Sequence, residues 1–153
     1  MKEISLLLIC TGLLASLSTL CVACNERPGS PRPEDRLLEP KNAWTLILKN
    51  KNNPRFVVLD VRTPTEFQSG HIEGAINIDY NSGRFRKDLS GLDPEKIYFI
   101  YCRTGRRTAE AVQIMRGLGF KNIVRMKGDV VAWKEENLPL VSAPRTALPS
   151  QTV

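Results

Sequence analysis

The sequence predicts an α/β fold in which a parallel sheet is flanked by helices on both faces. Short apolar runs rich in β-branched residues alternate with stretches of helical character through the middle of the chain. The length of 153 residues and the apolar content of 42% suit one domain with a sizeable core. Strands that alternate with helices pair in parallel and are covered by those helices, which defines the expected architecture.

The domain is predicted to begin with a helix, a strand and a second helix. NAWTLIL, residues 42–48, suits a short helix, and RFVVLD is a β-branched strand that ends at Asp60. The next helix is expected to begin near Pro64, because Thr63 can serve as its N-cap and Glu66 can close a capping box.

The alternation continues to the end of the domain. A short strand in GAINI and a helix or irregular crossover in GRFRKDLSGL precede KIYFIY, which is predicted as a strongly buried strand. The helix in RTAEAVQIMRGLGF is expected to end at Gly119 and to bury one face, made of Ala109, Val112, Met115 and Leu118. NIVRM is predicted as the last strand and GDVVAWKEEN as the last helix, which places Trp133 in the core.

The first segment, residues 1–23, is predicted to be a signal peptide of the lipoprotein type. Lys2 precedes a leucine-rich run without charge, and CVAC resembles the lipobox of bacterial lipoproteins, which implies lipidation of Cys24. Cys21 stands where the lipobox usually has a large aliphatic residue, so an uncleaved signal anchor stays open as an alternative. The resemblance implies a lipid-anchored protein of the bacterial cell envelope that faces the periplasm or the outer surface.

The predicted domain, residues 37–141, lies between two segments without apolar periodicity. Residues 24–36 are rich in proline and are interpreted as a tether, whose extended form would reach about 35 Å. Residues 142–153 have a similar composition and are interpreted as a disordered tail.

The cysteines and the net charge limit the functions that the chain can have. Processing at Cys24 would remove Cys10 and Cys21, so Cys102 would be the one free thiol of the mature protein, either inert or reactive. A single histidine and one free thiol cannot supply a zinc site, and no metal or cofactor is expected. The net charge of +6 is interpreted as a solvated basic surface and not as a nucleic-acid interface.

The segment FIYCRTGRRTAE places Cys102 between the buried strand and a helix that starts near Thr108. In open α/β sheets ligands bind at this carboxyl edge of the strands. Backbone N–H groups of the loop and the helix N-terminus can cradle an anion, and a thiolate would be favoured further by Arg103, Arg106 and Arg107. An apolar filler beside solvent-facing arginines is the weaker interpretation, since an inert cysteine gains nothing from them.

In three segments, in this order and spacing, the chain resembles the rhodanese-homology domain, the sulfurtransferase family: VVLDVRTPTEFQSGHIEGAINI, YFIYCRTGRRTAEA and MKGDVVAWKEENLPL. The resemblance implies a rhodanese-like fold of five parallel strands flanked by helices. It also implies that Cys102 carries a persulfide between two half-reactions. Asp129 departs from the family pattern, which often has a second glycine before the tryptophan.

Loop length separates two chemistries within the wider superfamily that this domain resembles. Four residues lie between Cys102 and Arg107, whereas cysteine-dependent phosphatases need one more to form a wider cradle for phosphate. The loop from Cys102 to Arg107 resembles the sulfurtransferase form, which disfavours phosphatase or arsenate reductase activity.

We expect Cys102 to attack the outer sulfur of a small anionic donor such as thiosulfate and to pass that sulfur to cyanide or a thiol. Arg107, the last loop residue, is the preferred arginine for attracting the donor. Backbone N–H groups and cationic side chains of the loop would hold donor and persulfide; the substrate-binding residues expected are Arg103, Thr104, Gly105, Arg106, Arg107 and Thr108.

Other polar residues are assigned to supporting or structural roles. Asp60 and Arg62 are expected to orient loops beside the site, and Glu66 belongs to its helix cap. His71, the single histidine, is interpreted as part of a structural turn, with general-base catalysis as the minor alternative. Arg84, Arg86 and Lys87 are interpreted as part of a solvated basic face. A position at the entrance to the site is the less favoured alternative for these residues.

A runner-up from another class stays open, namely a sulfur carrier or redox-sensing module in which Cys102 holds sulfur or oxidises without rapid turnover. The fold by itself does not separate these functions. The protein is expected to be a monomer or a homodimer.

Overall fold

A computed structural model describes residues 36–142 of the protein, arranged as one five-stranded sheet with helices on both faces. The predicted signal peptide, Cys24, most of the tether and most of the tail lie outside the described residues. Within the described residues, no helix is both long enough and apolar enough to span a bilayer.

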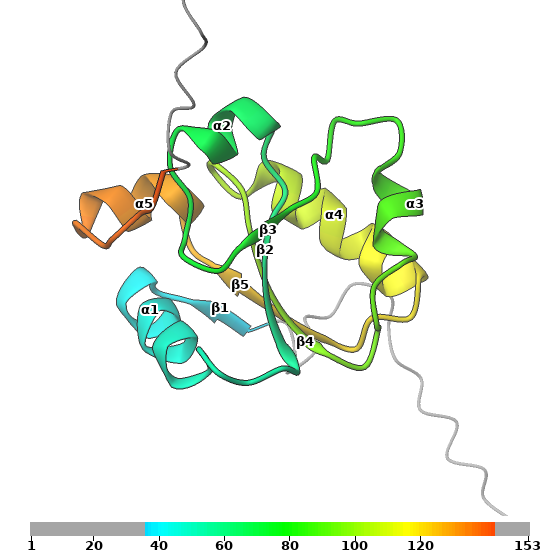
Figure 1. The fold of residues 1–153 in the computed structure, drawn as a ribbon, viewed down its shortest axis with the longest axis horizontal. Coiled ribbons are helices and arrows are strands. Elements are labelled where there is room, and N and C mark those ends of the chain that lie inside the picture. Colours follow the sequence, from blue (N-terminus) through cyan, green and yellow to red (C-terminus); the bar gives the residue numbers. More distant parts are fainter. Residues whose placement is uncertain (1–35, 143–153) are drawn as a thin grey trace, which may run out of the picture. The chain divides into compact units, whose positions relative to one another are not determined.

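All strands of the sheet run parallel in the order β1-β5-β4-β2-β3 (Figure 1). This arrangement confirms the predicted fold class. The strands are β1 (Arg36–Leu38), β2 (Phe56–Asp60), β3 (Ile76–Asn77), β4 (Ile97–Tyr101) and β5 (Asn122–Met126). The central strand β4 pairs with β2 on one side and with β5 on the other, so its carboxyl end lies between two neighbouring loops.

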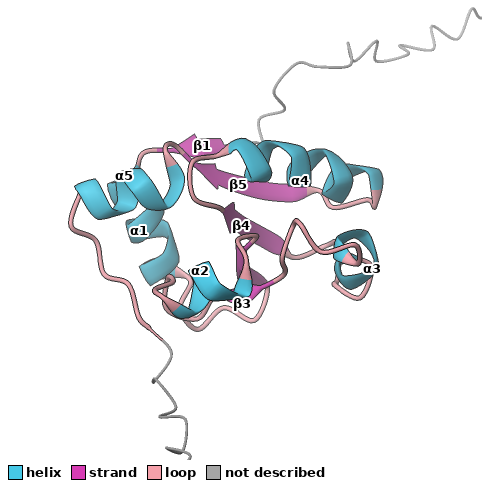
Figure 2. Ribbon diagram, turned by 90° about the horizontal axis from the view of Figure 1, so that it is seen from above, coloured by secondary structure: helices cyan, strands magenta, loops and turns pink. Residues whose placement is uncertain are grey.

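Helices cover the sheet on two sides, and each side has its own apolar cluster (Figure 2). One cluster packs α3 and α4 against side chains such as Leu59 and Ile100, and the other packs α1 and α5 against side chains such as Phe99 and Tyr101. The helices are α1 (Pro40–Lys49), α2 (Pro64–Gln68), α3 (Phe85–Leu89), α4 (Arg106–Gly117) and α5 (Asp129–Glu135).

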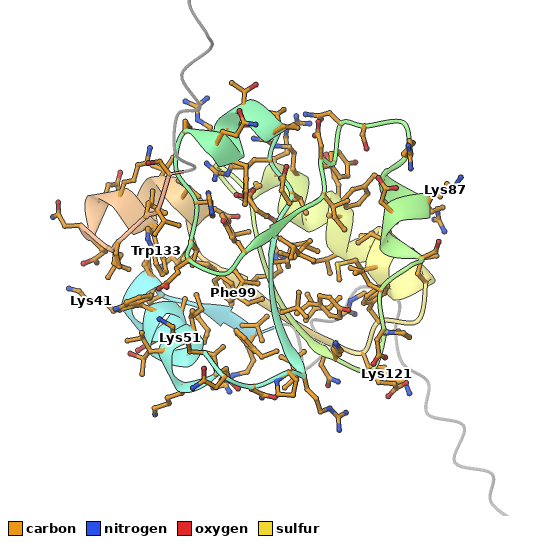
Figure 3. All side chains as sticks on the ribbon, in the orientation of Figure 1. Lys41, Lys51, Lys87, Phe99, Lys121 and Trp133 are labelled. Carbon is orange, nitrogen blue, oxygen red and sulfur yellow. The ribbon has the colours of Figure 1, made fainter. Side chains whose placement is uncertain are left out.

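Phe99 and Trp133 lie inside the domain, whereas the labelled lysines lie on its periphery (Figure 3). The indole of Trp133 is fully buried, packs edge-on against Trp44 and donates from Nε1 to the carbonyl of Pro139 at 3.0 Å. The prediction of Trp133 as a core residue is therefore confirmed.

The start of α2 follows the sequence prediction in detail. The Thr63 hydroxyl accepts a hydrogen bond from the backbone N–H of Glu66 at 3.3 Å, and the Glu66 carboxylate accepts one from the backbone N–H of Thr63 at 3.2 Å. This reciprocal capping box satisfies donors that the first helical turn leaves unpaired.

Two elements differ from the sequence prediction. Strand β1 was not predicted, because a run of three residues has no readable period; it begins at Arg36, the last residue of the predicted tether.

The buried face of α4 is rotated relative to the predicted face, so that Ala109 and Leu118 are only partly buried. The fully buried residues of that helix are Thr108, Ala111, Val112 and Met115. The rotation follows from a tertiary bond, since the Thr108 hydroxyl is held by a carboxylate of α5.

The predicted end of α4 is confirmed. Gly119 follows the C-cap Leu118 and has a φ of 89°, the left-handed conformation that closes many helices.

Candidate active site

The loop after β4 lies where three chain segments meet at the carboxyl edge of the sheet. The backbone N–H of Val61, which follows β2, donates to the carbonyl of Tyr101 at 3.0 Å. From α5, the N–H groups of Val130 and Val131 donate to the carbonyls of Cys102 and Arg103 at 3.3 and 3.2 Å. The loop is thus fastened on both sides by its neighbours.

Cys102 follows the last residue of β4 and its side chain is almost completely buried, at 1% exposure. Its Sγ accepts a hydrogen bond from the backbone N–H of Gly105 at 3.1 Å. An N–H that points at sulfur stabilises negative charge there, as expected of an anion cradle. Cys102 is the free cysteine of the described residues.

Gly105 gives the loop its curvature. Its φ of 95° lies in the left-handed region, and it is the N-cap of α4, a helix of 12 residues. A Cβ at this position would also lie only 3.2 Å from Oδ2 of Asp129, so the tight approach of loop and carboxylate favours glycine.

Asp129 is part of the site, which the sequence did not indicate beyond its departure from the family glycine. The carboxyl is 1% exposed, and its Oδ1 accepts hydrogen bonds from the backbone N–H of Cys102 and from the Thr108 hydroxyl, the latter at 2.9 Å. Burial raises the pKa of Asp129, against the opposing effect of hydrogen bonds from the Cys102 backbone and the Thr108 hydroxyl and of the Cys102 side chain nearby.

The three loop arginines have different environments. Arg103 is exposed, and Arg106 is exposed beside Glu110 at 3.5 Å. The Arg107 side chain is only 13% exposed and forms a two-pronged ion pair with Glu66, at 2.7 Å from Nη1 to Oε2 and 2.9 Å from Nη2 to Oε1. Hydrogen bonding by Arg107 lowers the pKa of Glu66 to about 2. Glu66 therefore joins α2 to α4 in addition to capping its own helix.

The predicted supporting pair, Asp60 and Arg62, forms a buried ion pair. Arg62 Nη2 donates to Asp60 Oδ2 at 2.6 Å and to the carbonyl of Gly70 at 2.7 Å. Burial alone would lower the pKa of Arg62, but the hydrogen bond and charge of Asp60 outweigh it and raise that pKa. Asn77 Nδ2 donates to the carbonyls of both residues, at 3.0 and 2.8 Å, so the pair fixes the loop after β2.

His71 is occupied by local contacts. Its ring stacks on Phe67 with centroids 3.7 Å apart, Nδ1 lies 2.9 Å from the Phe67 carbonyl, and its backbone pairs with Val141. Arg84, Arg86 and Lys87 are exposed around α3, and Arg84 lies 3.5 Å from Asp88.

A cleft of about 370 Å³ adjoins the loop between α2 and α5. Arg103 and Lys134 supply exposed positive charge, and Val130 and Val131 supply apolar surface. The remaining lining residues are Arg62, Glu66 and Ser69. Two other hollows, of about 180 and 240 Å³, lie against α1, and no residue of the Cys102 loop lines them.

The fold and the site define an α/β domain that presents a single cysteine within a loop of backbone donors at the carboxyl edge of a parallel sheet. The model of the rhodanese-like domain family matches residues 43–136, and the chain belongs to this family.

Relatives in the family include sulfurtransferases. A sulfurtransferase of Allochromatium vinosum is 28% identical over 86 residues, which are 56% of this chain and 78% of that protein. MoeZ of Mycobacterium tuberculosis is 33% identical over 85 residues, 56% of this chain, but the match spans only 22% of that protein's length.

Solved structures share the fold. A rhodanese-related protein from Thermoplasma volcanium is 32% identical with a TM-score of 0.58, and the match covers 71% of this chain and 99% of that one. The polysulfide-sulfur transferase homodimer of Wolinella succinogenes is 30% identical with a TM-score of 0.56, covering 76% of this chain and 85% of that one.

Proposed function

We propose that this protein is a sulfurtransferase that moves a sulfane sulfur from a donor such as thiosulfate to cyanide or a thiol through a Cys102 persulfide. The observation that carries the proposal is the 3.1 Å hydrogen bond from the Gly105 N–H to Cys102 Sγ, in a loop that begins a helix. Membership in a family with sulfurtransferase relatives supports the same chemistry.

The reaction would proceed in two displacements. The Cys102 thiolate attacks the outer sulfur of thiosulfate, a new sulfur–sulfur bond forms, and the electron pair of the broken bond leaves with sulfite. Cyanide or a thiolate then attacks the terminal sulfur of the persulfide, and the electron pair returns to Sγ. The Gly105 N–H stabilises the anionic sulfur in both stages.

Donor binding is assigned to the cleft beside the loop. Arg103 and Lys134 would attract an anion there, and Arg107 contributes positive charge near Cys102 while its guanidinium remains paired with Glu66. In this proposal Arg103, whose side chain lines the cleft, contacts the donor, and Arg107 attracts it through its charge.

The decisive experiment uses residues 25–153, which contain the whole sheet and both apolar clusters. A nearly complete match to the Thermoplasma chain indicates that such a region folds without a further domain. The purified protein should release thiocyanate from thiosulfate and cyanide, and Cys102→Ser should not. A wild-type protein that gains no sulfur by intact mass spectrometry and shows no turnover refutes the proposal.

A sulfur carrier without rapid turnover is the second candidate, and the 1% exposure of Cys102 favours it because a sulfur so enclosed is poorly accessible to an acceptor. A mass increase of one sulfur atom on Cys102 without turnover on any acceptor would identify the carrier.

We also propose a lipid anchor at Cys24 and an envelope location facing the periplasm or the outer surface, supported by the CVAC sequence. The full-length protein should incorporate labelled palmitate in a bacterial host, and Cys24→Ala should not. Unlabelled wild-type protein would refute the anchor.

A further inference from the structure

Asp129 is a buried acid beneath the Cys102 loop that the sulfur transfer described so far does not use. A carboxylate at 1% exposure is unfavourable unless its charge is compensated. Within residues 36–142 its hydrogen-bond partners are Cys102 and Thr108, and no lysine or arginine forms an ion pair with it. A buried titratable group that destabilises the fold and lies beside the reacting cysteine is a candidate for a role in the reaction.

The contacts place the Cys102 thiol between a donor and an acceptor. Gly105 N–H donates to Sγ at 3.1 Å, and the same glycine lies against the Asp129 carboxyl, whose Oδ2 would be 3.2 Å from a Cβ at position 105. The carboxyl is held in place on its other side by the Cys102 backbone N–H and the Thr108 hydroxyl. The Cys102 side chain therefore has a carboxyl held in place beside its loop, while negative charge on its sulfur faces an N–H.

The charged groups around this pair come from three elements. Arg125 of β5 lowers the pKa of Asp129 by its charge, and Arg107 of α4 interacts with the charge of Cys102. Arg107 is already bonded to Glu66, and Arg62 is bonded to Asp60, so neither guanidinium pairs with the Asp129 carboxyl. Cys102 is thus the titratable residue that is bound directly to Asp129, through its backbone N–H.

We propose that Asp129 is the proton acceptor for Cys102, and that the two side chains share one proton throughout the reaction cycle. This role rests on the proposed sulfur transfer and assigns its proton-transfer step to Asp129. The thiol proton passes from Sγ to the carboxylate, and the thiolate attacks the donor sulfur as sulfite leaves with the electron pair. The persulfide anion then coexists with a neutral Asp129.

The second half-reaction reverses the proton transfer. When the acceptor takes the terminal sulfur, the electron pair of the broken bond returns to Sγ and the proton returns from Asp129. Across the cycle the protein neither gains nor loses a proton, an electron or a sulfur atom. The buried site also never carries two adjacent negative charges, which would repel strongly in this enclosed position.

Asp129→Asn separates this role from a structural one. The amide oxygen of asparagine can still accept from the Cys102 N–H and the Thr108 hydroxyl, so the loop keeps its anchor. The amide cannot take up the thiol proton. Asp93→Asn is the matched control, because Asp93 precedes β4 at the opposite end from Cys102 and accepts a bond from the Glu95 N–H that asparagine also accepts.

The test is the pH dependence of Cys102 alkylation by iodoacetamide, followed by intact mass on residues 25–153, where Cys102 is the sole cysteine. The wild-type pair holds one proton over a broad range, so the wild-type rate should change less than about threefold between its two outer ionisations. In Asp129→Asn the rate should fall about tenfold per pH unit on the acidic side of a single ionisation. Asp93→Asn should follow the wild type.

A second measurement observes the carboxyl itself. After sulfur loading from thiosulfate, the infrared spectrum of the wild type should contain the carbonyl band of a protonated carboxyl, and this band should be missing from the spectrum of loaded Asp129→Asn. Alkylation profiles of the same shape in wild type and Asp129→Asn would overturn the proposal, as would a Cys102 that is not alkylated at any pH. If the alkylation profiles differ as expected but thiosulfate loads no sulfur, the proton role stands and the donor assignment fails.

Discussion

Replacement of Glu66 by glutamine tests whether the contact between α2 and α4 depends on charge. The new amide side chain can still complete the capping box with Thr63, since glutamine serves in that motif, but it cannot pair with the Arg107 guanidinium as an ion. The substitution therefore removes the ion pair and leaves the helix cap.

The magnitude follows from the pKa of Glu66, which falls from 4.5 to about 2, mainly because of Arg107, with a further contribution from hydrogen bonds to Thr63. At 1.36 kcal/mol per pH unit this corresponds to about 3.4 kcal/mol. The Glu66 side chain is 29% exposed, and solvent screening reduces the expected loss in the free energy of unfolding to about 1–2 kcal/mol.

The pH dependence has a definite sign. A lowered pKa in the folded state stabilises the protein above the unfolded value of 4.5 and ceases to do so as the pH falls toward 2. Thermal unfolding followed by circular dichroism should show Glu66→Gln melting about 4–12 °C below wild type near neutral pH. The gap should close as the pH falls through this window.

Glu73→Gln is the control for this experiment, because Glu73 forms an exposed pair with Lys51 at 3.2 Å. Its melting temperature should change little at any pH. A destabilisation of Glu66→Gln that is the same at neutral and acidic pH would refute the ionic explanation and assign the effect to packing.

Three further substitutions test other parts of the site and core. Asp129→Asn should unfold at higher denaturant concentration than wild type at neutral pH, because the raised pKa of Asp129 makes its charged form unfavourable in the folded protein. The protonated carboxyl carries no such cost below the unfolded pKa of 3.8, so the difference between the two proteins should vanish in acid. An equal difference at all pH values would contradict this reasoning. Gly105→Ala should lower the free energy of unfolding by about 1–2 kcal/mol, because its φ is 95° and its Cβ would approach Asp129 Oδ2; urea titration measures the loss, and an unchanged midpoint would show that the loop relaxes freely. Met115→Ala should cost about 2–5 kcal/mol in the same assay, since Met115 is fully buried in the cluster under α4, whereas the half-buried Ile114 should lose less on the same truncation.

Local sequence patterns were sufficient to predict most of the helices and strands. The capping box of Thr63 and Glu66 and the turn at Gly119 depend on neighbouring residues, and both were predicted correctly. Strand β1 was missed because its three residues are held by pairing with β5, far along the chain. The rotated face of α4 was missed for a similar reason, since a bond from Thr108 to α5 fixes the helix orientation.

The sequence by itself determined the α/β fold, the family resemblance and the position of Cys102 between β4 and α4, because these depend on apolar periodicity and on contiguous motifs. Only the tertiary structure decided which charges act on that cysteine. Arg107 pairs with Glu66, which lies 41 positions earlier, and Asp129, which lies 27 positions after Cys102, binds the backbone of the loop. Contacts of this kind form when separate strands bring their carboxyl ends together, and no local spacing records them.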